Sequence, residues 1–252
     1  MRAIILAAGK GSRLYPLTKN IPKCLVKVKD ISILEIQVKT LLKSGVKEII
    51  VVTGHNNDKI KNPRIIKIFN KDFNSTNMVF SLMCAKDFLE DDVIISYGDI
   101  IYKQEILNKL LDHKEDIVVA SDKSWLNYWS KRFDDPLSDA ESFKIRDNKI
   151  IESLGQKASS TGEIQGQYIG LIKLSKNGCK ILKQTYQNAN KKSTNIWGSG
   201  RNLENAYMTD ILNYLSTIYR IHYVEIDRGW YEIDSVSDWE IANDEIDWLN
   251  EL

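Results

Sequence analysis

The sequence is poor in cysteine, histidine and proline. It has 3 cysteines, 3 histidines and 4 prolines in 252 residues. The cysteines are an odd number, widely separated and without a CxxC pair, so neither a disulfide framework nor a zinc site is indicated. The histidines are equally scattered, and an isolated histidine is more often a packed or surface residue than a ligand. We therefore assign no function to either residue type.

An excess of one charge and a long apolar run are also missing. The 35 Lys and Arg residues against 34 Asp and Glu residues leave a formal net charge of +1, so no long-range field favours nucleic acid or an anionic membrane. The first apolar run, residues 3–8, is too short for a signal sequence or a membrane span. These absences predict a cytoplasmic protein with small-molecule partners. The sequence leaves the oligomeric state open.

An alternation of β-prone runs and helical repeats is present in the first half. We expect strands at residues 2–6, 48–53, 65–69 and 93–97, and helices at 31–43 and 77–88. Strands and helices that alternate in this way form right-handed crossovers. They predict an α/β fold with a Rossmann-like, mixed and mostly parallel sheet flanked by helices.

The second half of the chain is less regular. We expect strands near residues 117–120, 142–145, 150–153, 167–173 and 221–226, helices at 175–188, 203–215 and 236–249, and a polar loop over 185–202. Some of these strands should be antiparallel. Because neither a repeat nor a long linker interrupts the sequence, we predict a single domain over residues 1–252.

A glycine-rich turn follows the first expected strand, in the string IILAAGKGSRLYPLTKNIPKCL. Small residues there let backbone N–H groups approach a polyanion. The expected nucleotide contacts in this turn are Leu6, Ala7, Ala8, Gly9, Gly11 and Ser12. Arg13 can engage phosphate oxygens through its planar fork and Lys23 can add a compact positive charge, so we predict that both are catalytic.

Three other kinds of glycine-rich turn compare with this one. Short glycine patterns also form plain tight turns. The dinucleotide-binding fingerprint requires a third glycine where Leu14 stands. A Walker A loop requires Ser or Thr after Gly9-Lys10, and Gly11 stands there instead.

The full string LAAGxGxRLxPLTxxxPKxL, from Leu6 to Leu25, resembles the opening motif of the nucleotidyltransferases that make nucleotide sugars and CDP-activated headgroups. The resemblance implies the nucleotide-diphospho-sugar transferase type of fold. It also implies that an NTP and Mg²⁺ bind beside this loop. In these enzymes an aspartate at the end of a central strand holds the metal ion.

Two aspartates match the metal positions of the resembling family. Asp99 follows the strand VIISYGD at its carboxyl end, where open α/β sheets place their ligands. Asp234 lies in GWYEIDSVSDW, before the last expected helix. Each aspartate alone would also fit a cap or a turn. Asp227 and Asp238 are weaker candidates, and Asp238 would fit a solvated helix position.

The resemblance extends to the nucleobase. It implies that the base lies near residues 52–54, where Gly54 would allow close approach. The string NSTNMVFSL resembles the segment beside cytosine in the CTP-using branch, and the expected contacts are Thr76, Asn77 and Ser81. Ser, Thr and Asn are also common helix caps, which is an equally simple explanation of the same letters.

The acceptor site is less clear from the sequence. Trp129 and Arg132 lie in an aromatic segment before an expected strand, and Asp210 lies in ENAYMTDIL. We predict that these three residues bind the acceptor. Packing in the core or in a flap would explain the aromatic residues as well, and ion pairing would explain the arginine.

The closest resemblance is to the small CTP-dependent group of phosphocholine, 2-aminoethylphosphonate and phosphoglutamine cytidylyltransferases. The strings NMVFSL, ISYGDIIY and DPLSDAESFK favour the phosphoglutamine type of capsular phosphoramidate biosynthesis. The expected reaction joins CTP to a small phosphorylated metabolite and releases pyrophosphate. Hexapeptide repeats are missing, so we expect a catalytic domain alone. The alternatives are a sugar-1-phosphate nucleotidyltransferase using dTTP, UTP or GTP, and a non-catalytic nucleotide sensor.

Overall fold

The structure, a computed structural model, describes residues 1–147 and 149–251. A nine-stranded sheet extends through it in the order β5-β4-β1-β6-β11-β8-β12-β10-β9. The strands of this sheet are β1 (Arg2–Ala7), β4 (Glu48–Thr53), β5 (Ile66–Phe69), β6 (Val93–Tyr97), β8 (Ile117–Asp122), β9 (Glu141–Arg146), β10 (Ile150–Lys157), β11 (Gln167–Leu174) and β12 (His222–Ile226).

The direction of the strands confirms the predicted mixed, mostly parallel sheet. β5, β4, β1 and β6 are parallel neighbours. β11 is antiparallel to β6 and β8, and β12 is parallel to β8. β10 and β9 complete the far edge as antiparallel strands. The four parallel strands end at one edge of the sheet, which is where the glycine-rich turn follows β1.

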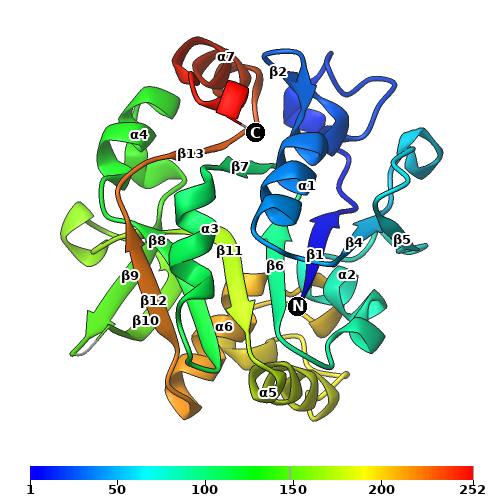
Figure 1. The fold of residues 1–252 in the computed structure, drawn as a ribbon. Helices are drawn as coiled ribbons and strands as arrows, with labels where there is room; N and C mark the ends of the chain where they lie inside the picture. The colour runs from blue at the N-terminus through cyan, green and yellow to red at the C-terminus, as the bar shows by residue number, and fades with distance from the viewer. Residues whose placement is uncertain (148, 252) are drawn as a thin grey trace.

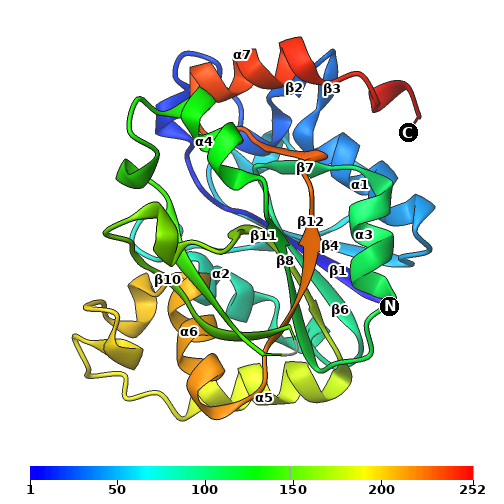
Figure 2. The same cartoon turned by 90° about the vertical axis from the view of Figure 1, so that its left-hand side faces the viewer.

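Helices cover both faces of the sheet (Figures 1 and 2). They are α1 (Ile33–Lys43), α2 (Met78–Cys84), α3 (Gln104–Leu111), α4 (Trp125–Arg132), α5 (Lys176–Gln187), α6 (Met208–Ile218) and α7 (Val236–Glu245). Apolar residues of α1, α3, α4 and α7 form one core cluster, and those of α2, α5 and α6 form the other. β1 contributes alternate residues to the two clusters, as expected for a strand covered on both faces.

The predicted helix over residues 203–215 is wrong at its start. A short 3-10 turn, Leu203–Asn205, comes first, and α6 begins only at Met208. The Asp210 side chain accepts a hydrogen bond from the Tyr207 backbone N–H at 2.7 Å, which starts a new helix there. The predicted helix over 236–249 also ends early, at Glu245.

Two short antiparallel ribbons were not predicted. β2 (Lys27–Val28) pairs with β3 (Ile31–Ser32), and β7 (Ile100–Tyr102) pairs with β13 (Trp230–Glu232). The second ribbon joins chain segments that are far apart in sequence. It places the residue before β7, Asp99, beside the segment that carries Asp234, and the Ile233 N–H donates to the Asp99 carbonyl at 2.8 Å.

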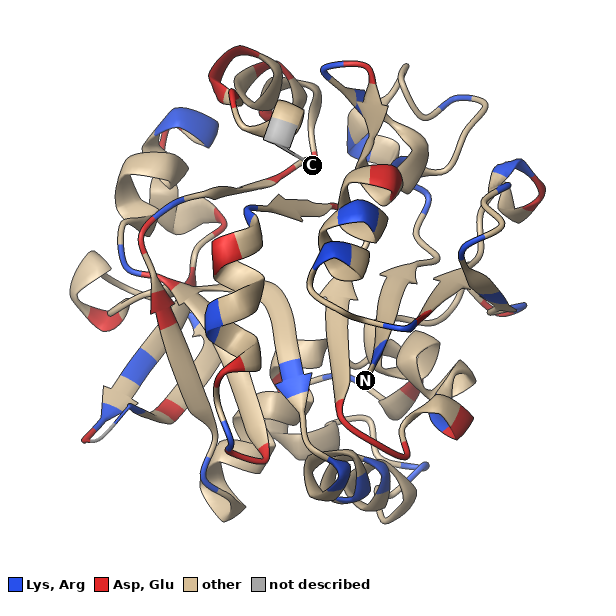
Figure 3. Ribbon diagram, viewed as in Figure 1, with Lys and Arg blue, Asp and Glu red and all other residues tan. Residues whose placement is uncertain are grey.

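Charged residues of both signs are distributed over the molecule (Figure 3), as the net charge of +1 suggests. None of the helices formed by residues 1–147 and 149–251 is long and apolar enough to cross a membrane.

Candidate active site

The glycine-rich turn makes a sharp bend directly after β1. Gly11 has φ 64°, a left-handed conformation that glycine adopts without strain. A Cβ atom at this position would lie 2.9 Å from the Lys23 Cβ, so glycine also makes room for the lysine. The Thr18 hydroxyl donates to the Gly11 carbonyl at 2.8 Å and closes the loop. These contacts hold the turn at the carboxyl end of β1, with Lys23 packed against Gly11.

Lys23 lies between the two predicted metal ligands. Its Nζ atom is 2.7 Å from Asp99 Oδ2 and 2.5 Å from Asp234 Oδ1. Arg13 forms a second ion pair with Asp234, and its side chain is 66% exposed. The structure thus brings together both predicted cationic residues and both predicted carboxylates, although they come from segments as far apart as residues 13 and 234.

The contacts shift the ionisation of these groups. Burial acts to lower the pKa of the Lys23 ammonium, but Asp99 and Asp234 outweigh it and raise that pKa. Burial acts to raise the pKa of the Asp234 carboxyl, but Lys23, followed by Arg13 and Arg132, lowers it overall. Lys23 is therefore charged and Asp234 is ionised at neutral pH.

Gln37 holds the turn that carries Asp99. Its side-chain Nε2 donates to the Tyr97 carbonyl at 3.0 Å and to the Ile100 carbonyl at 2.7 Å, and its Oε1 accepts from the Ser96 hydroxyl at 2.8 Å. Gln37 is 1% exposed. Gln37 was not predicted from the sequence, although a polar residue among the apolar residues of the helix is a signal that could have indicated it.

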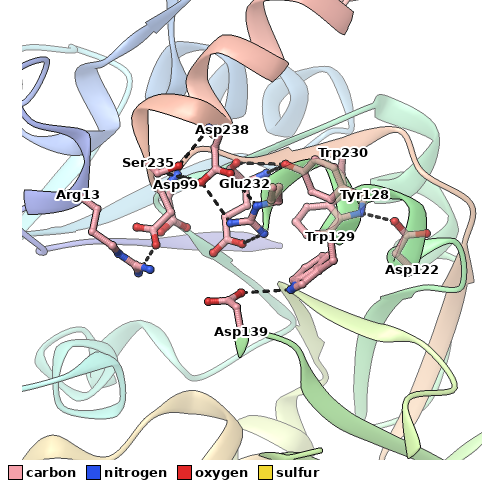
Figure 4. Close-up of polar contacts among 12 residues, drawn as sticks. Arg13, Asp99, Asp122, Tyr128, Trp129, Asp139, Trp230, Glu232, Ser235 and Asp238 are labelled. Carbon is pink, nitrogen blue, oxygen red and sulfur yellow. Dashed lines mark hydrogen bonds and ion pairs between the residues drawn. The ribbon is translucent and has the colours of Figure 1, made fainter. Parts of the chain in front are cut away.

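Asp238 performs the same task for Asp234. Its Oδ2 accepts from the backbone N–H groups of Asp234 at 3.1 Å and Ser235 at 2.9 Å, and its carboxylate is bound by Arg132 at 2.7 Å. Arg132 also binds Glu232 at 2.7 Å. Figure 4 shows Glu232, Ser235 and Asp238 beside Arg13 and Asp99. The interpretation of Asp238 as a solvated residue is wrong, because its side chain is only 3% exposed.

A cavity of about 340 Å³ lies along the glycine-rich turn. Thirteen of the sequence-predicted residues line it: Leu6, Ala7, Ala8, Gly9, Gly11, Ser12, Arg13, Lys23, Thr76, Asn77, Ser81, Asp99 and Asp234. Lining residues that the sequence analysis did not name are Cys24, Phe73, Met78 and Gly98. A Cβ atom at Gly98 would lie 2.6 Å from the Leu6 carbonyl oxygen, so the ends of β6 and β1 can approach only with glycine there.

Gly54 does not line this cavity. A Cβ atom there would lie 2.4 Å from the Ala8 carbonyl oxygen and 2.7 Å from the Phe73 Cβ. The glycine thus permits the glycine-rich turn and Phe73 to pack closely on the end of β4. Its proposed contact with the base stays a prediction.

A second cavity of about 270 Å³ shares Arg13, Met78, Asp99 and Asp234 with the first. Aromatic and acidic residues form most of its other walls: Tyr97, Trp129, Tyr168, Tyr207, Trp230, Asp139, Glu141 and Glu232. Burial raises the pKa of the Glu141 carboxyl to about 7, and Asp139, Asp210 and Glu232 act in the same direction while Arg201 opposes them. Among the residues described as lining this cavity, Arg13 is the only cation.

The three predicted acceptor residues lie in different settings. Trp129 lines the second cavity, and its indole N–H donates to Asp139 at 3.2 Å. Arg132 is not a lining residue, and its side chain is 2% exposed between Glu232 and Asp238. Asp210 starts α6 and binds Arg201 at 3.0 Å. Only Trp129 therefore has the placement that direct acceptor contact requires, and the contacts of all three stay predictions.

The carboxylates fit a hard divalent cation. Asp99 Oδ1 is buried and has no hydrogen-bond partner within residues 1–147 and 149–251. The same part of the chain contains no cluster of three or more His, Cys, Asp or Glu side chains suited to a metal ion. Mg²⁺ commonly binds through one or two carboxylates and completes its shell with substrate phosphates and water. Asp99 and Asp234 could hold it in that way.

These features are those of an enzyme that transfers a nucleotidyl group, and the comparisons agree. The nucleotidyl transferase family matches residues 2–121. The chain is 44% identical over 253 residues to the CTP:phosphoglutamine cytidylyltransferase of Campylobacter jejuni subsp. jejuni serotype O:2, covering 96% of this chain and 98% of that protein. The chain therefore belongs to the nucleotidyltransferase family.

Other relatives support this membership. The choline-phosphate cytidylyltransferase of Streptococcus pneumoniae is 34% identical over 114 residues, which are 44% of this chain and 50% of that protein. The solved structure of a CTP:phosphocholine cytidylyltransferase from Streptococcus pneumoniae matches with a TM-score of 0.71 at 22% identity, over 96% of this chain and 97% of that one. At this identity the structural match shows the shared fold alone.

Proposed function

We propose that this protein is a Mg²⁺-dependent cytidylyltransferase that joins CTP to a small phosphorylated metabolite and releases pyrophosphate. The observation that carries the proposal is the meeting of two cavities at Arg13, Asp99 and Asp234. One cavity follows the glycine-rich turn and suits a nucleoside triphosphate. The other suits an acceptor whose phosphate would lie at the shared wall, next to the α-phosphorus.

In the proposed reaction, an oxygen of the acceptor phosphate attacks the α-phosphorus of CTP. The bond from that phosphorus to the oxygen bridging to the β-phosphate breaks, and pyrophosphate leaves without a covalent enzyme intermediate. Asp99 and Asp234 would hold Mg²⁺, which would neutralise part of the phosphate charge. Arg13 and Lys23 would balance the remaining charge, and the backbone of the turn would orient the triphosphate. Catalysis is then positioning and charge neutralisation.

The second cavity favours an acceptor that carries a cationic nitrogen. Its walls contain Asp139, Glu141 and Glu232 together with several aromatic rings, and carboxylates and aromatic faces both stabilise an ammonium group. The 44% identical relative is named for phosphoglutamine. Our best candidate is accordingly L-glutamine phosphate, for capsular phosphoramidate biosynthesis, followed by phosphocholine and 2-aminoethylphosphonate.

The acidic second cavity argues against the alternative of a sugar-1-phosphate nucleotidyltransferase, because a sugar phosphate offers no positive group to these carboxylates. The alternative of a nucleotide sensor needs no second cavity at the α-phosphate end of the first. It predicts CTP binding without turnover.

Incubation with CTP, Mg²⁺ and each candidate phosphate tests the proposal. Pyrophosphate release measures turnover, and mass spectrometry identifies the product. We expect a CDP-linked product with an ammonium-bearing phosphate and little reaction with glucose 1-phosphate. Faster reaction of dTTP, UTP or GTP with a sugar phosphate would overturn the proposal, and tight CTP binding without pyrophosphate release from any acceptor would favour the sensor.

A further inference from the structure

Asn70 is a fully buried polar residue directly after β5, with 0% of its surface exposed. It does not line the nucleotide cavity, and the proposed reaction gives it no task. Its backbone N–H donates to the Thr53 carbonyl at 2.9 Å. Its side-chain Oδ1 accepts from the Asp72 backbone N–H at 3.0 Å. Because a backbone N–H can only donate, this contact fixes which way the Asn70 amide faces.

The amide nitrogen of Asn70 then faces two hydroxyl groups. Asn70 Nδ2 donates to Thr76 Oγ1 at 3.0 Å and to Ser81 Oγ at 3.1 Å. The Thr76 hydroxyl donates its own hydrogen to the Asp72 carbonyl at 2.9 Å. No acceptor for the Ser81 hydroxyl hydrogen occurs within residues 1–147 and 149–251, although Ser81 is only 6% exposed. Ser81 lines the nucleotide cavity, so that hydrogen is available to a ligand.

Asn77 adds a second donor to the same wall. Its Oδ1 accepts from the Met78 backbone N–H at 2.8 Å, which leaves its amide hydrogens for the cavity that it lines. The wall formed by the start of α2 therefore presents donors through Ser81 and Asn77. Cytosine offers two neighbouring acceptors, N3 and O2, on its pairing edge. Uracil and thymine carry a hydrogen on N3 instead.

We propose that Asn70 is a positioning residue for base specificity: it holds Ser81 as a hydrogen-bond donor, so that the cavity prefers cytosine over uracil. The inference rests on the proposed use of CTP. Asn70 lies outside the cavity, so it would act on the base only through Ser81. Its effect depends on which atom donates in each hydrogen bond and not on the shape of the pocket.

The substitution Asn70→Asp tests this directly. It keeps the size and shape of the side chain but replaces the donating nitrogen with an accepting oxygen, which would draw the Ser81 hydrogen away from the cavity. We expect kcat/KM for CTP to fall by about 10-fold to 100-fold, mainly through KM, and the preference for CTP over UTP to narrow by about 10-fold. A loss that is equal for CTP and UTP would mean a structural role and would overturn the inference.

Ser81→Ala removes the donor itself and keeps the test valid if Asn70→Asp does not fold. It should narrow the preference for CTP over UTP by a similar factor. The double variant of Asn70→Asp with Ser81→Ala should narrow this preference no further, because the two changes remove the same interaction. Ser75→Ala is the matched control. Within residues 1–147 and 149–251 this exposed hydroxyl bonds only to the Asp72 carbonyl, at 3.2 Å, and its loss should change neither nucleotide's KM. If Ser81→Ala retains the full CTP preference, the inference is wrong.

Binding of CTP and UTP to the unsubstituted protein, measured by calorimetry, separates this inference from the proposed function. Equal affinity for the two nucleotides would reject the choice of CTP and the inference with it. A clear preference for CTP that Asn70→Asp leaves intact would reject the inference alone.

Discussion

At the scale of single residues, Lys23 determines the charge balance of the site. Its ammonium contacts both Asp99 and Asp234. We expect Lys23→Met to lower kcat by about 100-fold or more, because the two carboxylates and the triphosphate then lose their central positive charge. Pyrophosphate release measures the change. Lys19→Met, at an exposed lysine four residues earlier, is the control. Normal turnover by Lys23→Met would contradict its catalytic role.

Glu141 should make acceptor binding depend on pH. Its pKa is raised to about 7, mainly by burial, so the fraction ionised rises from about 10% at pH 6 to about 90% at pH 8. An ammonium group binds the ionised form, and the acceptor KM should therefore fall up to about tenfold between these values. The acceptor phosphate titrates in the same pH range. The informative measurement is therefore the difference between the profiles of acceptor KM against pH for the unsubstituted protein and for Glu141→Gln. Glu141→Gln should raise KM and remove this part of the pH dependence.

The residues that line the proposed nucleotide cavity could be predicted from the sequence, whereas those of the proposed acceptor cavity, apart from Trp129, could not. The residues of the glycine-rich turn lie within one short string, and their spacing carries the information. The acceptor cavity instead collects Glu141 from β9, Tyr168 from β11, Tyr207 before α6 and Glu232 from β13. In the sequence each of these resembles an ordinary strand or cap residue, because nothing local indicates that they converge.

At the scale of elements, the meeting of β1 and β6 controls the position of Asp99. A Cβ atom at Gly98 would lie 2.6 Å from the Leu6 carbonyl and 2.9 Å from the Ala7 Cα. We expect Gly98→Ala to lower the free energy of unfolding by about 1–3 kcal/mol and to reduce kcat by displacing Asp99. Chemical denaturation and pyrophosphate release measure the two effects.

Gly9→Ala is the contrasting change, since an added Cβ meets nothing within 4 Å there. It should leave the stability unchanged and raise the KM for CTP, because the methyl group would take up space in the cavity that Gly9 lines. If both glycine variants lost the same stability, the tight contact between β1 and β6 would not explain Gly98.

Arg132 joins α4 to β13 and α7 through its ion pairs with Glu232 and Asp238. Arg132→Met should cost about 3–5 kcal/mol of folding free energy, because the buried Asp238 and the partly buried Glu232 lose the cation that pairs with them. The thermal stability and the acceptor KM of this variant together show whether Arg132 has a structural role or contacts the acceptor. A large loss of stability identifies a structural ion pair. A raised acceptor KM at unchanged stability would instead support the direct acceptor contact predicted from the sequence.

β1, β4 and α1 were predictable because a continuous apolar run marks each of the two strands and a helical repeat of apolar residues marks the helix. The ribbon of β7 and β13 was not, because each strand has three residues and pairs with a partner more than a hundred positions away. α4 was missed for a different reason. Its aromatic residues were attributed to packing in the core or in a flap and no helix was predicted there, and Trp125, Tyr128 and Trp129 are buried in the core.

At the scale of the whole molecule, the site joins the two halves of the chain. One continuous sheet extends from β5 to β9, and the single domain over residues 1–252 stays a prediction. Asp99 belongs to the parallel half, and Asp234 lies between β13 and α7. A ligand bound between these carboxylates therefore stabilises the contact between distant segments, and its binding should be visible in the stability of the whole fold.

We therefore expect CTP with Mg²⁺ to raise the melting temperature by about 5–10 °C when the nucleotide is about 100-fold above its Kd, a gain of about 2.7 kcal/mol. Chelation with EDTA should remove most of this shift, because Asp99 and Asp234 then repel the triphosphate. The double variant Asp99→Asn with Asp234→Asn should show the same shift in melting temperature with and without Mg²⁺. That shift should be smaller than the shift of the unsubstituted protein with Mg²⁺. Because the amides neither repel the triphosphate nor hold the ion, the decisive quantity is the difference between the two conditions. An equal shift for the unsubstituted protein in EDTA and in Mg²⁺ would mean that these carboxylates do not bind the metal.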